Sequence, residues 1–343
     1  MLSWRHTCGR SIDTGISVSM LALCLYGSAM FAATPRSVDP PAKPFAVTHV
    51  NHLSLVVSDY AKSRDFYLRV FGMRLAWDDG KSCALEFGDL AAPDGMYLRG
   101  LNPGEHPGVN HIAFALEDFM ARKAEMKAEL DRRGLANLRA DGAVGWSFND
   151  PAGYPLNVVV VKHKAMFPGA ASVCADAESA ACAAAYATGA KNLEVSHAPR
   201  GRGLVATAFS HIVLRVADVP AELGFYRDVL GMRPIQTLAG RSASLRFGRN
   251  TLYLRTLQSR SDKPVVDHFA FVIDGWNRAR VKATLQREGL APSANSAMAW
   301  SVADPDGLVI EAAGSGLPEY VAARCIGHSG GANPPGCPGG ADQ

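Results

Sequence analysis

The chain has 343 residues, of which 48% are hydrophobic and 20% are charged, and its formal net charge at pH 7 is +3. This length exceeds what one hydrophobic core usually organises, so at least two globular domains are expected. The small net charge comes without any block of basic residues, which argues against nucleic acid or an anionic membrane as a partner. A small molecule is the expected partner.

The chain begins with the features of a secretory signal. Arg5 and Arg10 precede an apolar run over residues 16–31, and small residues follow before Pro35. The run is shorter than the roughly 20 residues that a membrane-spanning helix needs. Residues 1–33 are therefore expected to be a cleaved signal peptide, and the mature protein to be periplasmic or secreted and free of the membrane. A membrane anchor is the alternative.

An internal repeat follows. Residues 52–74 align without a gap on residues 211–233, and ten of the 23 aligned positions are identical. The similarity continues through YLR in both halves, NHIAF against DHFAF, and WSFNDPAG against WSVADPDG. Two copies of one domain are therefore predicted, at residues 46–162 and 207–315.

Strand and helix signals alternate within each copy in the order βαβββ. From His52 the chain alternates with a period of two, and the next segment has apolar residues at helical spacing and ends at Gly72, as a helix C-terminus does. The elements expected in the first copy are strands at 52–57, 75–78, 83–87, 96–101, 111–116 and 156–161, and helices at 61–71 and 118–133. Each copy thus holds two βαβββ units, and the chain holds four.

The segments outside the two copies carry most of the cysteines. Residues 163–206 form a linker rich in Ala and Gly, and residues 316–343 form an irregular tail. Four cysteines lie there, none at zinc-finger or CxxC spacing: Cys174, Cys182, Cys325 and Cys337. In an exported protein disulfides are the better explanation. Four cysteines allow three pairing schemes, and the scheme with two local disulfides is favoured because each closes a short loop. Cys83, in a predicted buried strand, is expected to stay a free thiol.

Three ionisable residues of the second copy lie on the less bulky faces of predicted strands. His211 shares a face with Val213, His268 with Ala270, and Glu311 with other small residues near the end of the copy. Each of them alone is more often a solvated or structural residue than a ligand. Together, two imidazoles and one carboxylate facing a cavity suit non-haem Fe(II), and also Mn(II) or Zn(II).

The first copy lacks one member of this set. His52 and His111 match the two histidines, but Asn157 stands where the second copy has Glu311. A neutral amide donates weakly to a dication and leaves its charge uncompensated, so the first domain is expected to hold no catalytic metal. Its histidines are expected to hydrogen-bond to Asn157 or to water, or else to serve a ligand of that domain's own.

These residues resemble a known family. The segments HLSLVVSD, SRDFYLRVFGMRL, HIVLRVAD and DPDGLVIE are similar to the vicinal oxygen chelate superfamily, which includes glyoxalase I, fosfomycin and bleomycin resistance proteins and extradiol ring-cleaving dioxygenases. The resemblance implies an α+β fold of two tandem domains, each of paired βαβββ units forming a half-open barrel. It implies a divalent metal, with Fe(II) favoured, on His211, His268 and Glu311. Four units in one chain resemble the extradiol dioxygenases, whose metal is held by the C-terminal pair alone.

The sequence indicates the reaction less closely than it indicates the fold. Tyr253 stands where glyoxalases of the family carry a fourth, carboxylate ligand, so a three-ligand site with open positions is implied. The stretch 293–307 lacks the His and Tyr that extradiol dioxygenases carry near the DPxG turn, and proton handling would fall to Tyr253, Arg246 or Arg255. Tyr253 and Arg255 are the catalytic candidates.

We therefore expect an exported metal-dependent enzyme that chelates two adjacent oxygens of a small substrate. Extradiol-dioxygenase-like oxidation is the first reading, because the four-unit layout and the His/His/Glu set agree with it. A glyoxalase-like lyase or isomerase is the second. The alternative from another class is a non-catalytic protein that binds an antibiotic or a small aromatic molecule. The substrate, the native metal and the oligomeric state are left open, a homodimer included.

Overall fold

The structure, a computed structural model, describes residues 43–89, 93–141, 145–160, 203–238, 240–259 and 262–317. The expected signal segment, the four cysteines expected to form disulfides, and most of the expected linker and tail lie outside these residues. Within these ranges, no helix has the length and apolar character needed to cross a membrane. Cys83 is buried and carries a free thiol.

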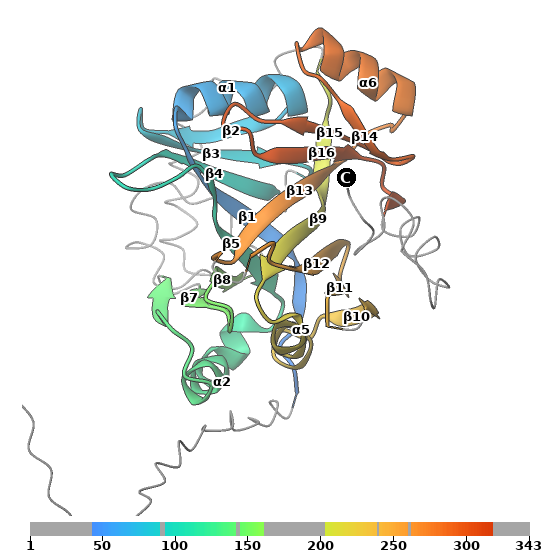
Figure 1. The fold of residues 1–343 in the computed structure, drawn as a ribbon. Coiled ribbons are helices and arrows are strands. Elements are labelled where there is room, and N and C mark those ends of the chain that lie inside the picture. Colours follow the sequence, from blue (N-terminus) through green and yellow to red (C-terminus); the bar gives the residue numbers. More distant parts are fainter. Residues whose placement is uncertain are drawn as a thin grey trace, which may run out of the picture. The chain divides into compact units, whose positions relative to one another are not determined.

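Each repeat forms one eight-stranded mixed sheet with two helices (Figure 1). The first sheet has the order β2-β3-β4-β1-β5-β8-β7-β6, and its repeat contains β1 (Val47–Val57), α1 (Tyr60–Phe71), β2 (Arg74–Asp78), β3 (Ser82–Phe87), β4 (Asp94–Gly100), β5 (Gly108–Leu116), α2 (Phe119–Arg132), β6 (Arg139–Asp141), β7 (Gly145–Asn149) and β8 (Pro155–Val160).

The second sheet repeats this arrangement as β10-β11-β12-β9-β13-β16-β15-β14. Its repeat contains β9 (Ala206–Val216), α5 (Val219–Asp228), β10 (Arg233–Leu238), β11 (Ser242–Phe247), β12 (Asn250–Thr256), β13 (Val265–Ile273), α6 (Arg278–Arg287), β14 (Ser293–Ser296), β15 (Ala299–Ala303) and β16 (Val309–Ala313). The predicted α+β fold of two tandem domains with paired βαβββ units is confirmed. The strand predicted from His111 begins three residues earlier, because Gly108 already pairs with β1.

Both helices that follow the first strand of a repeat are capped in the same way. Asp59 before α1 and Asp218 before α5 each accept a hydrogen bond from the backbone N–H three residues on, at 3.0 Å. Gly72 ends α1 in the left-handed conformation, with φ of 63°, and a Cβ atom there would lie 2.6 Å from the carbonyl oxygen of Leu204. Leu204, inside the segment expected to be linker, is buried, and its N–H donates to Val70.

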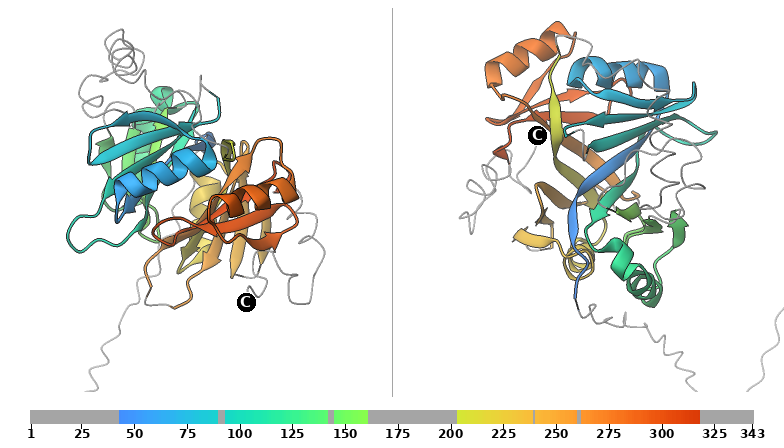
Figure 2. Two further views of the ribbon diagram at one scale, coloured as in Figure 1. Left: turned by 90° about the horizontal axis from the view of Figure 1, so that it is seen from above. Right: turned by 180° about the vertical axis from the view of Figure 1, so that it is seen from behind.

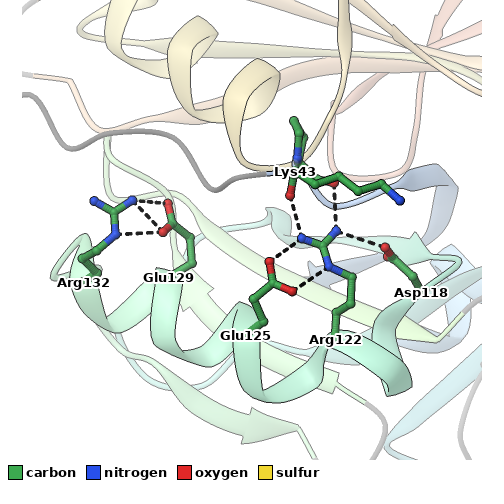
Figure 3. Close-up of polar contacts among 7 residues, drawn as sticks. Lys43, Asp118, Arg122, Glu125, Glu129 and Arg132 are labelled. Carbon is green, nitrogen blue, oxygen red and sulfur yellow. Dashed lines mark hydrogen bonds and ion pairs between the residues drawn. The ribbon is translucent and has the colours of Figure 1, made fainter.

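Arg122 of α2 holds the segment that leads into β1 (Figure 3). Its guanidinium donates to the backbone carbonyl oxygens of Lys43, at 2.6 Å, and Pro44, at 2.9 Å. The same group forms ion pairs with Asp118, at 3.1 Å, and Glu125, at 2.5 Å. One side chain therefore fixes how the chain enters the strand that carries the first of the paired histidines.

The two repeats contact each other through matching hydrogen bonds. Tyr67 of α1 donates to Asp304 in the turn before β16, at 3.1 Å, and Tyr226 of α5 donates to Asp150 in the turn before β8, at 2.9 Å. Both carboxylates belong to the DPxG turns that recur in the sequence. Figures 1 and 2 accordingly show α1 beside the last strands of the second sheet. Each repeat thus contributes one tyrosine and one DPxG carboxylate to the contact between the two repeats.

Two buried carboxyl groups, Asp150 and Glu222, are hydrogen-bonded to each other at this contact. Burial, followed by the negative charge of Asp150, raises the pKa of Glu222 well above its usual range. Burial also raises the pKa of Asp150, although hydrogen bonds from Tyr154 and Tyr226 oppose this. At neutral pH the folded pair therefore keeps a proton that the unfolded chain releases.

This proton makes stability depend on pH. A carboxyl group whose pKa is raised by folding stabilises the protein fully below its unfolded value of about 4.3 and loses that contribution as pH rises toward the folded value. Glu222→Gln keeps the hydrogen bond and removes the titration. We expect the variant to be more stable than the parent by about 1–2 kcal/mol at about pH 8 and equal to it at about pH 4. Urea unfolding at both pH values measures this, and a parent with the same stability at both would contradict it.

Candidate metal centre

Three adjacent central strands of the second sheet bring His211, His268 and Glu311 together. The strands β9, β13 and β16 are neighbours in the sheet, and each contributes one of the three residues. Ala270 of β13 lies opposite both His211 and Glu311 in the register. Because its methyl group is small, the larger side chains on either side can approach the same point.

The three side chains can hold one ion. Nε2 of His211 lies 3.5 Å from one oxygen of Glu311, and Nε2 of His268 lies 3.8 Å from the other. All three ligand atoms are within 4.8 Å of one another, and the three residues are buried. Metal–ligand bonds of about 2.0–2.2 Å would separate ligand atoms by about 3–4.4 Å. Two imidazoles and one carboxylate also match the chemistry of Fe(II), Mn(II) and Zn(II) sites.

Asp267 orients His268 toward this point. Its carboxylate lies 2.8 Å from Nδ1 of His268, and because a carboxylate only accepts, Nδ1 must donate. In the neutral ring the lone pair is then on Nε2, which faces Glu311. Burial alone would raise the pKa of Asp267, but hydrogen bonds from His268 and Arg215 outweigh it and hold that pKa well below its usual range.

The sequence analysis did not identify Asp267. Alternation along a strand would place it on the face opposite His268. The pairing of β9 with β13 shifts register between Val266 and His268, so Asp267 is the extra residue of a bulge and turns beside its neighbour. The sequence signal that was available is an acidic residue directly before a strand histidine, in a place where the first repeat has Asn110.

The predicted catalytic residues, Tyr253 and Arg255, lie near His211. The ring of Tyr253 packs edge-on against its imidazole, with centroids 5.3 Å apart. Burial lowers the pKa of His211 to about 4, and the charge of Arg255 adds to this while Glu311 opposes it. His211 is therefore neutral at pH 7, the form that coordinates a metal. Ser301 donates to Glu311, at 3.3 Å.

The first repeat arranges the equivalent residues differently. Nε2 of His52 lies 3.2 Å from Nε2 of His111, so one imidazole donates to the other. The side-chain amide of Asn157 lies 3.5 Å from Nε2 of His111. The expectation that these histidines hydrogen-bond to the amide is met by His111, while His52 instead contacts the other ring and, through Nδ1, Asn51, at 2.8 Å.

We expect only the second repeat to bind metal tightly. The protein should contain about one equivalent of divalent metal per chain, because the first repeat has no carboxylate at this position. His52→Ala combined with His111→Ala should leave that content unchanged. Elemental analysis of both proteins measures it. Two equivalents that fall to one in the double variant would contradict this expectation.

Asp267→Asn tests the orientation of His268. The variant places in the second repeat the residue that the first repeat carries at 110, and an amide can turn its NH₂ toward Nδ1 and reverse the tautomer. We expect metal affinity to fall about 10–100-fold, measured by competition with a chelator. Asp65→Asn, which changes an exposed carboxylate on α1, is the matched control. Equal affinities for Asp267→Asn and the parent would show that the carboxylate does not position the ring.

Comparison with known proteins places the chain in a family. The family described as "Glyoxalase/Bleomycin resistance protein/Dioxygenase superfamily" matches residues 49–158 and 208–312, one match in each repeat. The protein YaeR of Escherichia coli (strain K12), described as uncharacterized, is 29% identical over 123 residues, which span 32% of this chain and 93% of YaeR.

Solved structures share the two-domain fold. The Mn(II)-bound glyoxalase from Novosphingobium aromaticivorans superimposes with a TM-score of 0.57 at 18% identity, covering 79% of this chain and 83% of the glyoxalase. A variant of homoprotocatechuate 2,3-dioxygenase from B. fuscum gives 0.58 at 17% identity, covering 80% and 73%. The 2,3-dioxygenase LapB from Pseudomonas sp. KL28 gives 0.58 at 14% identity, covering 79% and 93%. At these identities the likeness concerns the fold.

Proposed function

This chain belongs to the glyoxalase/bleomycin resistance protein/dioxygenase superfamily, and on that premise we propose that its second repeat is the active centre of a metal-dependent enzyme. The enzyme acts on a small substrate that presents two adjacent oxygens, and the proposed reaction is a dioxygenase-like oxidation with Fe(II) as the metal. The observation that carries this proposal is the convergence of His211, His268 and Glu311 on one buried point.

Four residues of the second repeat have separate roles in the proposed reaction. When bound, the ion acts as a Lewis acid that polarises the substrate oxygens. Glu311 supplies the negative charge that compensates the cation, and Asp267 holds His268 in the coordinating tautomer. The phenol of Tyr253, beside His211, is placed to exchange a proton with a substrate hydroxyl. Arg255, close enough to lower the pKa of His211, can stabilise an anionic substrate oxygen.

One observation favours a second candidate, a lyase, an isomerase or a metal-dependent binding protein. Near the DPxG turn the side chain of Trp300 donates to the backbone carbonyl of Arg278, at 3.0 Å, and the hydroxyl of Ser301 donates to Glu311. Neither is an acid or base suited to a catechol. Proton transfer therefore rests on few groups, a limitation that weighs less on reactions other than ring cleavage.

The proposal is tested on the full chain purified without oxygen. Elemental analysis should find iron, and oxygen uptake should occur with members of a panel of catechols and hydroxy acids. Glu311→Gln should abolish the uptake. Bound metal with substrate turnover but no oxygen consumption would establish the lyase or isomerase reading instead. Metal-dependent ligand binding without turnover would establish the binding protein, and the absence of any bound divalent metal would overturn the proposal.

Export is proposed separately. It rests on the composition of residues 1–33 and on the cysteines outside the two repeats. Mass analysis of the exported protein under non-reducing conditions should find a mature terminus near Ala33 and Cys83 as the single free thiol.

A further inference from the structure

The first repeat contains a cavity that the proposed reaction does not use. Its volume is about 310 Å³, and its lining comes from β1 to β5 and β8 and includes His52, Ser54, Trp77, Tyr97, Arg99 and His111. Several of these side chains are only partly buried, so the cavity reaches the surface. Since a cavity of about 150 Å³ holds benzene, this volume suits a substituted single ring or a bicyclic molecule.

The histidines at one end of this cavity are satisfied by the protein. The two Nε2 atoms of His52 and His111 hydrogen-bond to each other at 3.2 Å. Their Nδ1 atoms lie 2.8 Å from Oδ1 of Asn51 and 3.0 Å from Oδ1 of Asn110. Turning one of these amides presents its NH₂ to Nδ1 and puts that ring's proton on Nε2, which then donates to the other ring. The pair is therefore satisfied within the protein, and the first repeat has Asn157 in place of a carboxylate that could compensate a cation here.

The cavity carries no uncompensated charge. Arg99 is the ionised side chain among the described lining residues, and two of its nitrogens pair with Glu105, at 2.6 and 2.8 Å. Burial, followed by the charges of Arg139 and Arg99, lowers the pKa of His111 to about 4, so its imidazole is neutral at pH 7. A charged ligand would lose its hydration without meeting a partner of opposite charge. An uncharged ligand avoids this cost.

The walls of the cavity favour an aromatic ring. Trp77 and Tyr97 lie with ring centroids 6.4 Å apart, and Tyr97 packs edge-on against His52 at 4.7 Å. The indole N–H of Trp77 is buried and has no hydrogen-bond partner within the described part of the chain. A buried donor without a partner destabilises the protein, and an oxygen atom of a ligand that accepts from it would remove this cost.

Two of the lining residues are particular to the first repeat. In the alignment of the repeats, Trp77 corresponds to Gln236 and Ser54 to Val213. We propose that the cavity of the first repeat is a second, metal-independent binding site for an uncharged aromatic molecule that carries a hydroxyl group. The site stands independently of the metal centre and of the reaction assigned to it.

Phenol, with benzoate as the anionic comparison, tests the proposal on the full-length Glu311→Gln protein after treatment with a chelator. The substitution and the chelator both remove divalent metal from the second repeat. Calorimetry should show about one saturable equivalent of phenol with a dissociation constant on the order of 0.1–1 mM. Benzoate should bind at least about tenfold more weakly, because the site offers it no counter-charge.

Two variants test whether phenol binds in the first repeat. Trp77→Gln and Ser54→Val each introduce the residue of the second repeat, and each should weaken phenol binding by about tenfold. Gln236→Ala is the matched control in the second repeat and should leave binding unchanged. Circular dichroism confirms that each variant is folded, and two independent variants keep the test valid if one is not. Absence of saturable binding, or loss of binding only in Gln236→Ala, would overturn the proposal.

Discussion

Replacing Glu311 by Gln should remove the tightly bound metal from the protein. The substitution keeps the volume of the side chain and removes only its charge, so the buried dication would face two neutral imidazoles and an amide. We expect the content of divalent metal to fall from about one equivalent to less than about a tenth. His211→Ala and His268→Ala should have the same effect, since each removes one of three ligands.

Elemental analysis after gel filtration measures this loss. Glu125→Gln, which changes a half-exposed carboxylate on α2, serves as the control and should keep its metal. The fold should survive in all three site variants, because Ile212, Phe269 and Ile310, the neighbours of these residues on the opposite strand faces, remain in the apolar core. An unchanged metal content in Glu311→Gln would mean that the carboxylate is not a ligand.

Phe271→Ala should destabilise both repeats together. Phe271 of β13 is fully buried, and its ring centroid lies 4.9 Å from that of Phe71, 5.1 Å from Phe87 and 5.5 Å from Phe209. The first two of these rings belong to the first repeat. Truncating a buried Phe costs about 3–5 kcal/mol through lost burial and the cavity left behind. The cost here falls on the contact between the repeats as well as on one core.

Denaturant unfolding followed by fluorescence and by far-UV circular dichroism measures the effect. The free energy of unfolding should fall by about 3–5 kcal/mol, and both probes should report one transition. Met120→Ala on α2 removes an exposed apolar side chain and should change stability by less than about 0.5 kcal/mol. Two separate transitions in the parent would show that the repeats unfold independently and that the aromatic contact contributes little to their coupling.

The two repeats differ at three positions around His268 and its equivalent, His111. Where the second repeat has Glu311, Asp267 and Arg215, the first has Asn157, Asn110 and Val56. Glu311 lies 3.8 Å from Nε2 of His268, whereas Asp267 contacts Nδ1 on the other side of the ring and is held by Arg215. Loss of the ligand charge and of the orienting carboxylate in the same repeat agrees with a cavity that holds an uncharged molecule instead of an ion.

The α+β fold of four βαβββ units could be predicted from the sequence because its signals are local. The repeat, the period-two runs and the Gly72 helix end depend on residues near one another in the chain. Strand parity also placed His211, His268 and Glu311 on the less bulky faces of their strands. The sequence could therefore predict the three residues as candidates. Their convergence on one point depends on the order of β9, β13 and β16 in the sheet.

The tertiary structure alone decided the remaining features, because each depends on register or on a contact between distant segments. A bulge turns Asp267 beside His268, against the alternation that strand parity predicts. The hydrogen bond between His52 and His111 requires β1 and β5 to be neighbours in a defined register. The contacts of the DPxG turns with the opposite repeat span more than 70 residues of sequence. A one-residue change in register would move any of these side chains to the other face, and local sequence signals do not determine register that finely.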